Sequence, residues 1–109
     1  GDAGLRALKE TRGDADEVPD ELILKAMNLL AKYEGIFAEP SGAASLAGLI
    51  KAIEDRKIDK DEVVVVLITG HGLKDPDIVK EVMGDAPVIN PDINEFKEVL
   101  KRKYGISLT

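Results

Sequence analysis

Residues 63–68 read VVVVLI and run directly into TGHG at residues 69–72. A β-branched run without polar alternation is typical of a strand that is buried on both faces of a parallel sheet. Asp75 and Pro76 follow, and they favour the start of a helix because Asp is a good N-cap and Pro suits the first helical position. The order of strand, loop and helix predicts an α/β fold. It also makes the loop at residues 69–72 the first candidate for a ligand site.

Helices are expected on both sides of this strand, because apolar residues recur there at three- and four-residue spacing. Their expected bounds are residues 3–12, 20–33, 41–55, 76–83 and 91–104, the third with Ser41 as its N-cap. Two short stretches, residues 14–18 and 86–89, are candidates for additional strands. We therefore expect a single α/β domain over residues 1–109, with layered helices around a short, mostly parallel sheet. Because that sheet is thin for so much helix, the chain is expected to be part of a larger domain.

The size and composition of the chain restrict its function. With 109 residues there is room for one core, and a compact body of this length has a radius of gyration of about 13 Å. Fifteen basic and 21 acidic residues give a net charge of −6, which repels nucleic acid and anionic membranes. The lack of Cys and the single His disfavour a metal site, and the strongest apolar run is far too short to span a membrane. We expect a cytoplasmic protein with no nucleic-acid, membrane or metal partner.

The loop at residues 69–72 has both a structural and a functional interpretation. Thr69 would lie at the carboxyl end of the strand, while Gly70 and Gly72 would allow a ligand to approach the backbone. The same glycines suit a tight turn from strand to helix, and the pattern alone does not choose between the two. His71 could act as a base, but a role in ordering the loop is favoured because no Cys or Ser nucleophile stands at motif spacing. Lys74 is expected to form a surface ion pair with the acids that follow it.

A second candidate segment begins at Glu39, which precedes a helix start with unusually small side chains. Residues 42–48 read GAASLAG, and such a face is usually found where another part of the protein packs against the helix backbone. The carboxylate of Glu39 could accept a hydrogen bond from a ligand or fix the neighbouring loop. A helix start crowded against the sheet is the structural alternative, and both interpretations can hold together.

Three motifs lie in these segments: EGIFAEP at residues 34–40, AASLAGL at residues 43–49 and LITGHGLKDP at residues 67–76. Together they resemble the C-terminal part of threonine synthases, which are fold type II pyridoxal-phosphate enzymes. The resemblance extends from about Leu5 to Tyr104. It implies that the chain is part of the large cofactor-binding domain of such an enzyme.

The resemblance also implies an activity and a set of cofactor-binding residues. Threonine synthases form L-threonine and phosphate from O-phospho-L-homoserine and water. Thr69 stands where the family places a hydroxyl at the pyridine nitrogen of pyridoxal phosphate. Gly70, His71 and Gly72 would then form a backbone wall beside the ring, with Glu39 behind the cofactor. The implied partner is the remainder of the enzyme chain, with a homo-oligomer as a further option.

The sequence departs from the family in two respects. The family usually reads EPASAAS, whereas residues 39–45 read EPSGAAS, so no ligand contact is assigned to Ser41. The family's Schiff-base lysine motif and its Ser-Gly-Asn phosphate loop do not occur in these 109 residues, and Lys74 is not that lysine. We therefore expect a C-terminal segment that has no catalytic residue and is inactive by itself. The alternative, from a different class of protein, is a stand-alone α/β domain that binds a protein partner or a small molecule.

Overall fold

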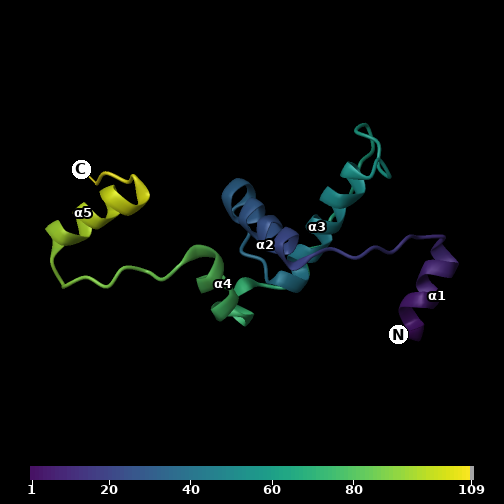
Figure 1. The fold of residues 1–109 in the computed structure, drawn as a ribbon, viewed down its shortest axis with the longest axis horizontal. Helices are drawn as coiled ribbons and strands as arrows, with labels where there is room; N and C mark the ends of the chain where they lie inside the picture. Colours follow the sequence, from purple (N-terminus) through teal and green to yellow (C-terminus); the bar gives the residue numbers. More distant parts are fainter. Residues whose placement is uncertain (109) are drawn as a thin grey trace.

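The computed structural model describes residues 1–108, apart from the side chains of residues 79, 82 and 83. Helices dominate this part of the chain (Figure 1). In chain order they are α1 (Asp2–Thr11), α2 (Asp20–Leu29), the π-helical turn η1 (Leu30–Glu34), α3 (Pro40–Glu54), the 3-10 turn η2 (Gly72–Lys74), α4 (Pro76–Met83) and α5 (Ile93–Tyr104). The helices predicted from apolar spacing are therefore confirmed. Within residues 1–108, no helix has both the length and the apolar character that crossing a membrane would require.

The starts of the later helices follow from the chemistry of single residues. The side chains of Asp75 and Asp92 accept hydrogen bonds from backbone N–H groups in the first turns of α4 and α5. The expected N-cap of α3 is wrong by two positions, because Glu39 and not Ser41 occupies it. Pro40 explains the difference, since its fixed φ is already helical and it lacks the N–H that the first turn leaves unpaired.

The expected sheet does not form within residues 1–108, where the strand-like pairing is limited to an isolated antiparallel bridge between Ala38 and His71. Residues 63–68 form no ladder, and Val63 and Val65 are 97% and 82% exposed instead of buried on both faces. The two shorter strand candidates are irregular as well. A strand needs a hydrogen-bonded neighbour, and the described part of the chain places none beside residues 63–68.

Residues 63–68 nevertheless have one covered side. Val66 and Ile68 line an apolar hollow together with Leu46 and Ile50 of α3, whereas Leu67 is largely exposed. This alternation has the two-residue period of an extended strand with one covered face. The other face, which carries three large apolar side chains, is open to solvent.

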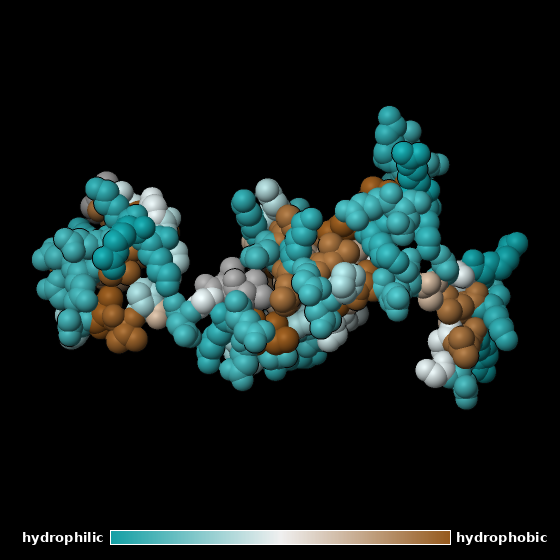
Figure 2. All heavy atoms as spheres, viewed as in Figure 1, coloured by the Kyte–Doolittle hydropathy of each residue, from teal (hydrophilic) through white to brown (hydrophobic). Residues whose placement is uncertain are grey.

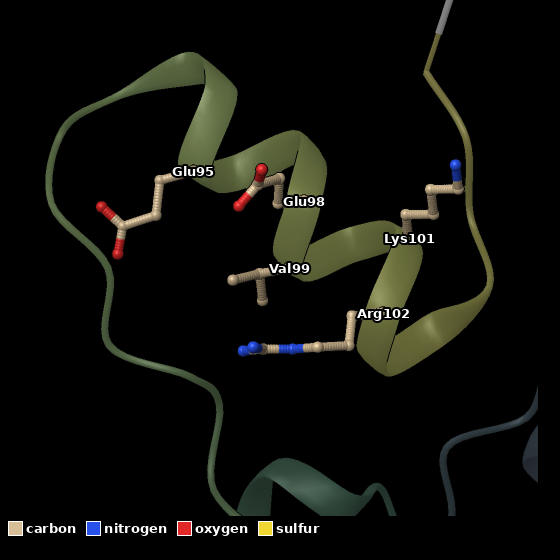
Figure 3. A pocket seen from close by; sticks show the side chains of 5 residues that line it. All are labelled: Glu95, Glu98, Val99, Lys101 and Arg102. Atoms are coloured by element: carbon tan, nitrogen blue, oxygen red, sulfur yellow. The ribbon is translucent and has the colours of Figure 1, made fainter.

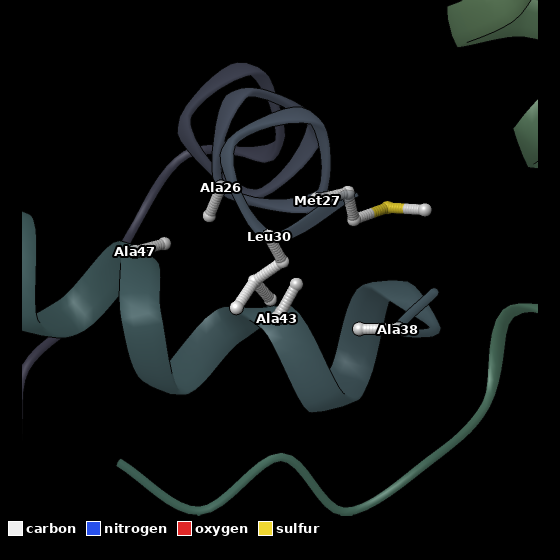
Figure 4. Packing of buried hydrophobic residues seen from close by; sticks show 6 residues of the cluster. All are labelled: Ala26, Met27, Leu30, Ala38, Ala43 and Ala47. Carbon is white, nitrogen blue, oxygen red and sulfur yellow. The ribbon is translucent and has the colours of Figure 1, made fainter. Parts of the chain in front are cut away.

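The core of the described structure lies between α2 and α3 (Figure 4). Its buried residues are Ala26, Met27, Leu30, Ala38, Ala43 and Ala47. Since most of these side chains are alanine, the two helices can approach closely. The apolar surface that they remove from water is correspondingly small, and so is the stabilisation that burial supplies. This core is therefore modest for a chain of this length.

The chain is extended, not compact. Its radius of gyration is 18.7 Å and its principal extents are 60 × 32 × 19 Å, against about 13 Å expected for the radius of gyration of a compact chain. Figure 1 shows α1 and α5 at opposite ends, away from the pair formed by α2 and α3. Apolar side chains gather over that central pair, and further apolar surface lies on both end helices (Figure 2). No residue of α1 is buried among the described residues.

A cluster of charges fastens the segment before α2 to the end of α3. The Nζ atom of Lys57 lies 3.0 Å from carboxylate oxygens of both Asp14 and Asp16, and Lys51 also pairs with Asp16. Hydrogen bonds from Lys51 and Lys57 hold the pKa of Asp16 well below its usual range, and the bond from Lys57 lowers the pKa of Asp14. The same bonds, led by that to Asp16, raise the pKa of Lys57. No local pattern in the sequence indicates this pairing, which joins residues about 40 positions apart.

Candidate functional site

Two segments that are far apart in the sequence lie side by side at the start of α3. The N–H of Glu39 donates to the carbonyl of Gly70 at 3.0 Å, and the N–H of Gly72 donates to the carbonyl of Phe37 at 2.9 Å. These two hydrogen bonds make the isolated bridge described above. The structure thus places the segment around Glu39 next to the loop at residues 69–72.

Gly70 leaves room for the side chain of Glu39. A Cβ atom built on Gly70 would lie 2.6 Å from Cγ of Glu39 and closer still to its carboxyl group. The Glu39 side chain is only 17% exposed, and its Oε1 pairs with Nζ of Lys74 at 3.3 Å. The ion pair of Lys74 is therefore formed across the two segments, whereas the sequence predicted it with the neighbouring acids Asp75 and Asp77.

The small residues at the start of α3 are explained by the same loop. Gly42 is buried, and a Cβ atom built on it would lie 3.0 Å from the backbone nitrogen of Gly70 and 3.3 Å from that of Thr69. One turn further, the hydroxyl of Ser45 donates to the carbonyl of Leu67 at 2.8 Å. The prediction that something packs against this helix backbone is confirmed, and residues 67–70 are what packs there.

The far end of the loop is ordered by an aromatic contact. A Cβ atom on Gly72 would lie 2.6 Å from Cζ of Phe37, so a larger residue here would displace the ring. The rings of Phe37 and His71 meet edge to face, with centroids 5.3 Å apart. Nδ1 of His71 accepts a hydrogen bond from the N–H of Leu73 at 3.2 Å, which places any ring proton of the neutral imidazole on Nε2. These contacts are those of a histidine that orders a loop.

An open hollow of about 560 Å³ lies where the two segments meet. Its lining residues are Gly35, Ile36, Phe37, Ile68, Thr69, Gly70 and His71. Three of the five predicted site residues, Thr69, Gly70 and His71, therefore line one hollow. Glu39 and Gly72 are not part of the lining and lie behind it, in contact with Gly70 and Phe37.

Another hollow lies on α5, far along the chain from this loop. It is lined by Val99 together with two acidic and two basic side chains (Figure 3), which are Glu95, Glu98, Lys101 and Arg102. Opposite charges in equal number on one helix face are typical of a solvated surface. Within the described residues, no group of three His, Asp or Glu side chains is placed to hold a metal ion.

Comparison with known proteins identifies the family to which this chain belongs. Residues 1–70 match the family of pyridoxal-phosphate dependent enzymes, and the chain belongs to that family. The matched part includes Glu39, Thr69 and Gly70, whereas His71 and Gly72 lie just beyond it.

Within this family, the chain is similar to threonine synthases. It is 48% identical over 98 residues to the enzyme of a Bacillus species, strain ULM1, which covers 89% of the chain and 28% of the relative. The threonine synthase of Methanocaldococcus jannaschii is 46% identical over 97 residues, and that of Mycobacterium tuberculosis H37Rv is 42% identical over 89 residues. These matches cover 89% and 82% of the chain and 24% of each relative. The chain thus spans about a quarter of the length of these relatives.

The residues at the hollow fit the edge of an aromatic cofactor ring. Ile36, Phe37 and Ile68 supply apolar lining, and Thr69 supplies a hydroxyl that can donate or accept a hydrogen bond. That hydroxyl makes no hydrogen bond to any residue that the structure describes. A flat ring with one polar atom at its edge needs a lining of this kind.

Proposed function

We propose that this chain is the C-terminal segment of a threonine synthase-like enzyme and forms one wall of its pyridoxal-phosphate site. One observation carries the proposal: the backbone pairing that joins Phe37 and Glu39 to Gly70 and Gly72. These residues belong to two of the three motifs that resemble the family, and they meet beside a hollow that Thr69 lines. The similarity to threonine synthases over most of the chain supports the same assignment.

The resemblance to threonine synthases implies the roles of these residues, and their places at the hollow support them. Bound pyridoxal phosphate supplies an electron sink for reactions at the amino-acid substrate. Thr69 offers the pyridine nitrogen a neutral hydroxyl, which does not favour protonation of that nitrogen as a carboxylate would. Gly70 and His71 would present their backbone beside the cofactor. Glu39 and Gly72 do not line the hollow, and they would hold the loop in place through their contacts with Gly70 and Phe37.

The complete enzyme would convert O-phospho-L-homoserine and water into L-threonine and phosphate. This chain contributes no catalytic residue to that reaction in our proposal. The Schiff-base lysine and the phosphate cradle come from the remainder of the enzyme chain, which is the main partner of the segment. The segment alone is therefore inactive.

The remainder of the enzyme also accounts for the missing sheet. We infer that residues 63–68 form a strand of a short, mostly parallel sheet whose other strands belong to that remainder. The exposed row of Val63, Val65 and Leu67 supports this inference, because a face of that kind needs a cover. The opposite side of residues 63–68, with Val66 and Ile68, lies against α3 of this same chain.

The proposal is tested by removing one hydroxyl from the complete enzyme. Thr69→Val preserves the shape of the side chain but cannot hydrogen-bond to the cofactor. We expect a rise of about two- to tenfold in the dissociation constant for pyridoxal phosphate, together with a change in the absorbance of the bound cofactor. Thr11→Val on α1 is the matched control, since among the described residues the Thr11 hydroxyl donates within its own helix, to the carbonyl of Ala7.

Two results would count against the proposal. If the Thr69→Val and Thr11→Val enzymes have equal affinities for pyridoxal phosphate and equal absorbance spectra, Thr69 does not contact the cofactor. Failure of the unaltered complete enzyme to release phosphate from O-phospho-L-homoserine would reject the reaction itself. The 109-residue chain, assayed alone in the same way, is expected to release none.

A further inference from the structure

The ion pair between Lys74 and Glu39 joins the two halves of the candidate site through their side chains. Nζ and Oε1 are 3.3 Å apart, and the lysine is far more exposed than the glutamate. The acids nearest to Lys74 in the sequence have other partners. Asp75 caps the first turn of α4, and Asp77 pairs with Lys80. Lys74 is thus engaged across the site and not along its own segment.

The position of the Glu39 carboxylate matters because it fills the space beside Gly70. Backbone hydrogen bonding to Gly70 fixes the main chain of Glu39, but the side chain retains several rotatable bonds. A carboxylate that is mostly removed from water is costly unless a partner compensates it. Among the described residues, the ammonium of Lys74 is that partner.

We propose that Lys74 is a positioning residue for the cofactor site: its ammonium holds the Glu39 carboxylate over Gly70 and so sets the conformation of the loop that presents Thr69. The inference rests on the proposed function, since it takes this loop to line the cofactor. Lys74 does not line the hollow, so it acts through Glu39 and does not touch the ring.

The test uses the complete enzyme in three variants. Lys74→Met removes the charge but keeps most of the apolar stem, and Lys74→Arg restores a cation. Lys80→Met is a closely matched control, because Lys80 has the same 63% side-chain exposure and the same ion-pair distance of 3.3 Å, but pairs within α4. The measurements are the dissociation constant of pyridoxal phosphate from each enzyme, the absorbance maximum of the bound cofactor, and the melting temperature.

Lys74→Met is expected to raise the dissociation constant about two- to fivefold and to shift the absorbance maximum. Lys74→Arg should restore both values, while Lys80→Met should leave both unchanged. In an enzyme that already carries Glu39→Gln, the Lys74→Met substitution should add little, because the charge that it serves is gone.

Two outcomes would overturn the inference while the proposed function stands. One is a Lys74→Met enzyme that matches Lys80→Met in affinity and spectrum. The other is an effect of Lys74→Met that stays the same size in the Glu39→Gln background. In both cases the unaltered enzyme still binds pyridoxal phosphate. If the unaltered enzyme does not bind the cofactor at all, the proposed function and this inference are both wrong.

Discussion

Two glycines and one carboxylate determine how closely the halves of the candidate site approach each other. Gly42 lets α3 meet the backbone of residues 69–70, and Gly70 makes room for the carboxylate of Glu39. In each case the missing side chain leaves space for another part of the protein and not for a ligand. The structural and the functional interpretations of this loop are therefore compatible, since packing behind the loop is what presents Thr69 at the hollow.

This packing predicts the effect of a methyl group at position 70. Gly70→Ala would force the new Cβ into the side chain of Glu39, so the ion pair with Lys74 must open or the loop must move. We expect the complete enzyme to lose about 1–3 kcal/mol of stability, measured by urea unfolding, as is usual when extra atoms enter a packed site.

Gly48→Ala is the control for this prediction. A Cβ atom built on Gly48 meets no neighbouring atom within 4 Å, and the residue lies inside α3. Alanine should therefore stabilise the helix by about 0.5–1 kcal/mol. A Gly70→Ala enzyme as stable as the Gly48→Ala enzyme would show that Glu39 does not occupy this space.

At the scale of elements, the charge cluster at the end of α3 predicts a dependence on pH. In the folded chain, a hydrogen bond from Lys57 lowers the pKa of Asp14. Hydrogen bonds from Lys51 and, to a smaller extent, from Lys57 lower the pKa of Asp16. A carboxyl group whose pKa is lowered on folding stabilises the structure at pH values above its pKa in the unfolded chain, which is about 3.9 for Asp. That stabilisation is lost as the pH falls through the pKa of the group in the folded chain.

We therefore expect residues 13–18 to stay attached to α3 at neutral pH and to detach as the pH falls below about 4. The amide NMR signals of these residues report the change, and added salt should weaken the contact because the side chains are accessible to solvent. Lys57→Met should release the segment already at pH 7, whereas Lys60→Met, three positions further on, should not. If the amide signals of residues 13–18 change neither at low pH nor in the Lys57→Met variant, these charges do not hold the segment.

The sequence predicted some elements well and others not at all. Helices were predictable because their apolar spacing and their Asp caps are local signals. The strand predicted at residues 63–68 forms no ladder within residues 1–108, because a strand is completed by neighbours that the sequence of one segment does not name. For the candidate site, the motifs selected two segments that the structure brings together, but the partner of Lys74 depends on how those segments meet in space.

At the scale of the whole molecule, the extended shape and the open apolar face belong together. In a chain with a radius of gyration of 18.7 Å, fifteen large apolar residues of the described part are exposed and lack the cover that a compact domain provides. Its similarity to about a quarter of the length of several threonine synthases is consistent with cover from the rest of such an enzyme. In our account, fold and site are completed by the same missing neighbours.

Hydrogen exchange in the complete enzyme, with and without pyridoxal phosphate, tests this account most directly. We predict slow exchange at residues 63–68 in both states, as in a paired strand, and further slowing at residues 69–72 and around Glu39 when the cofactor binds. The amides of α1 serve as the internal control and should not respond to the cofactor. Two results would contradict the claim that this chain forms a wall of the cofactor site. One is rapid exchange at residues 63–68, and the other is an exchange rate at residues 69–72 that does not change when pyridoxal phosphate binds.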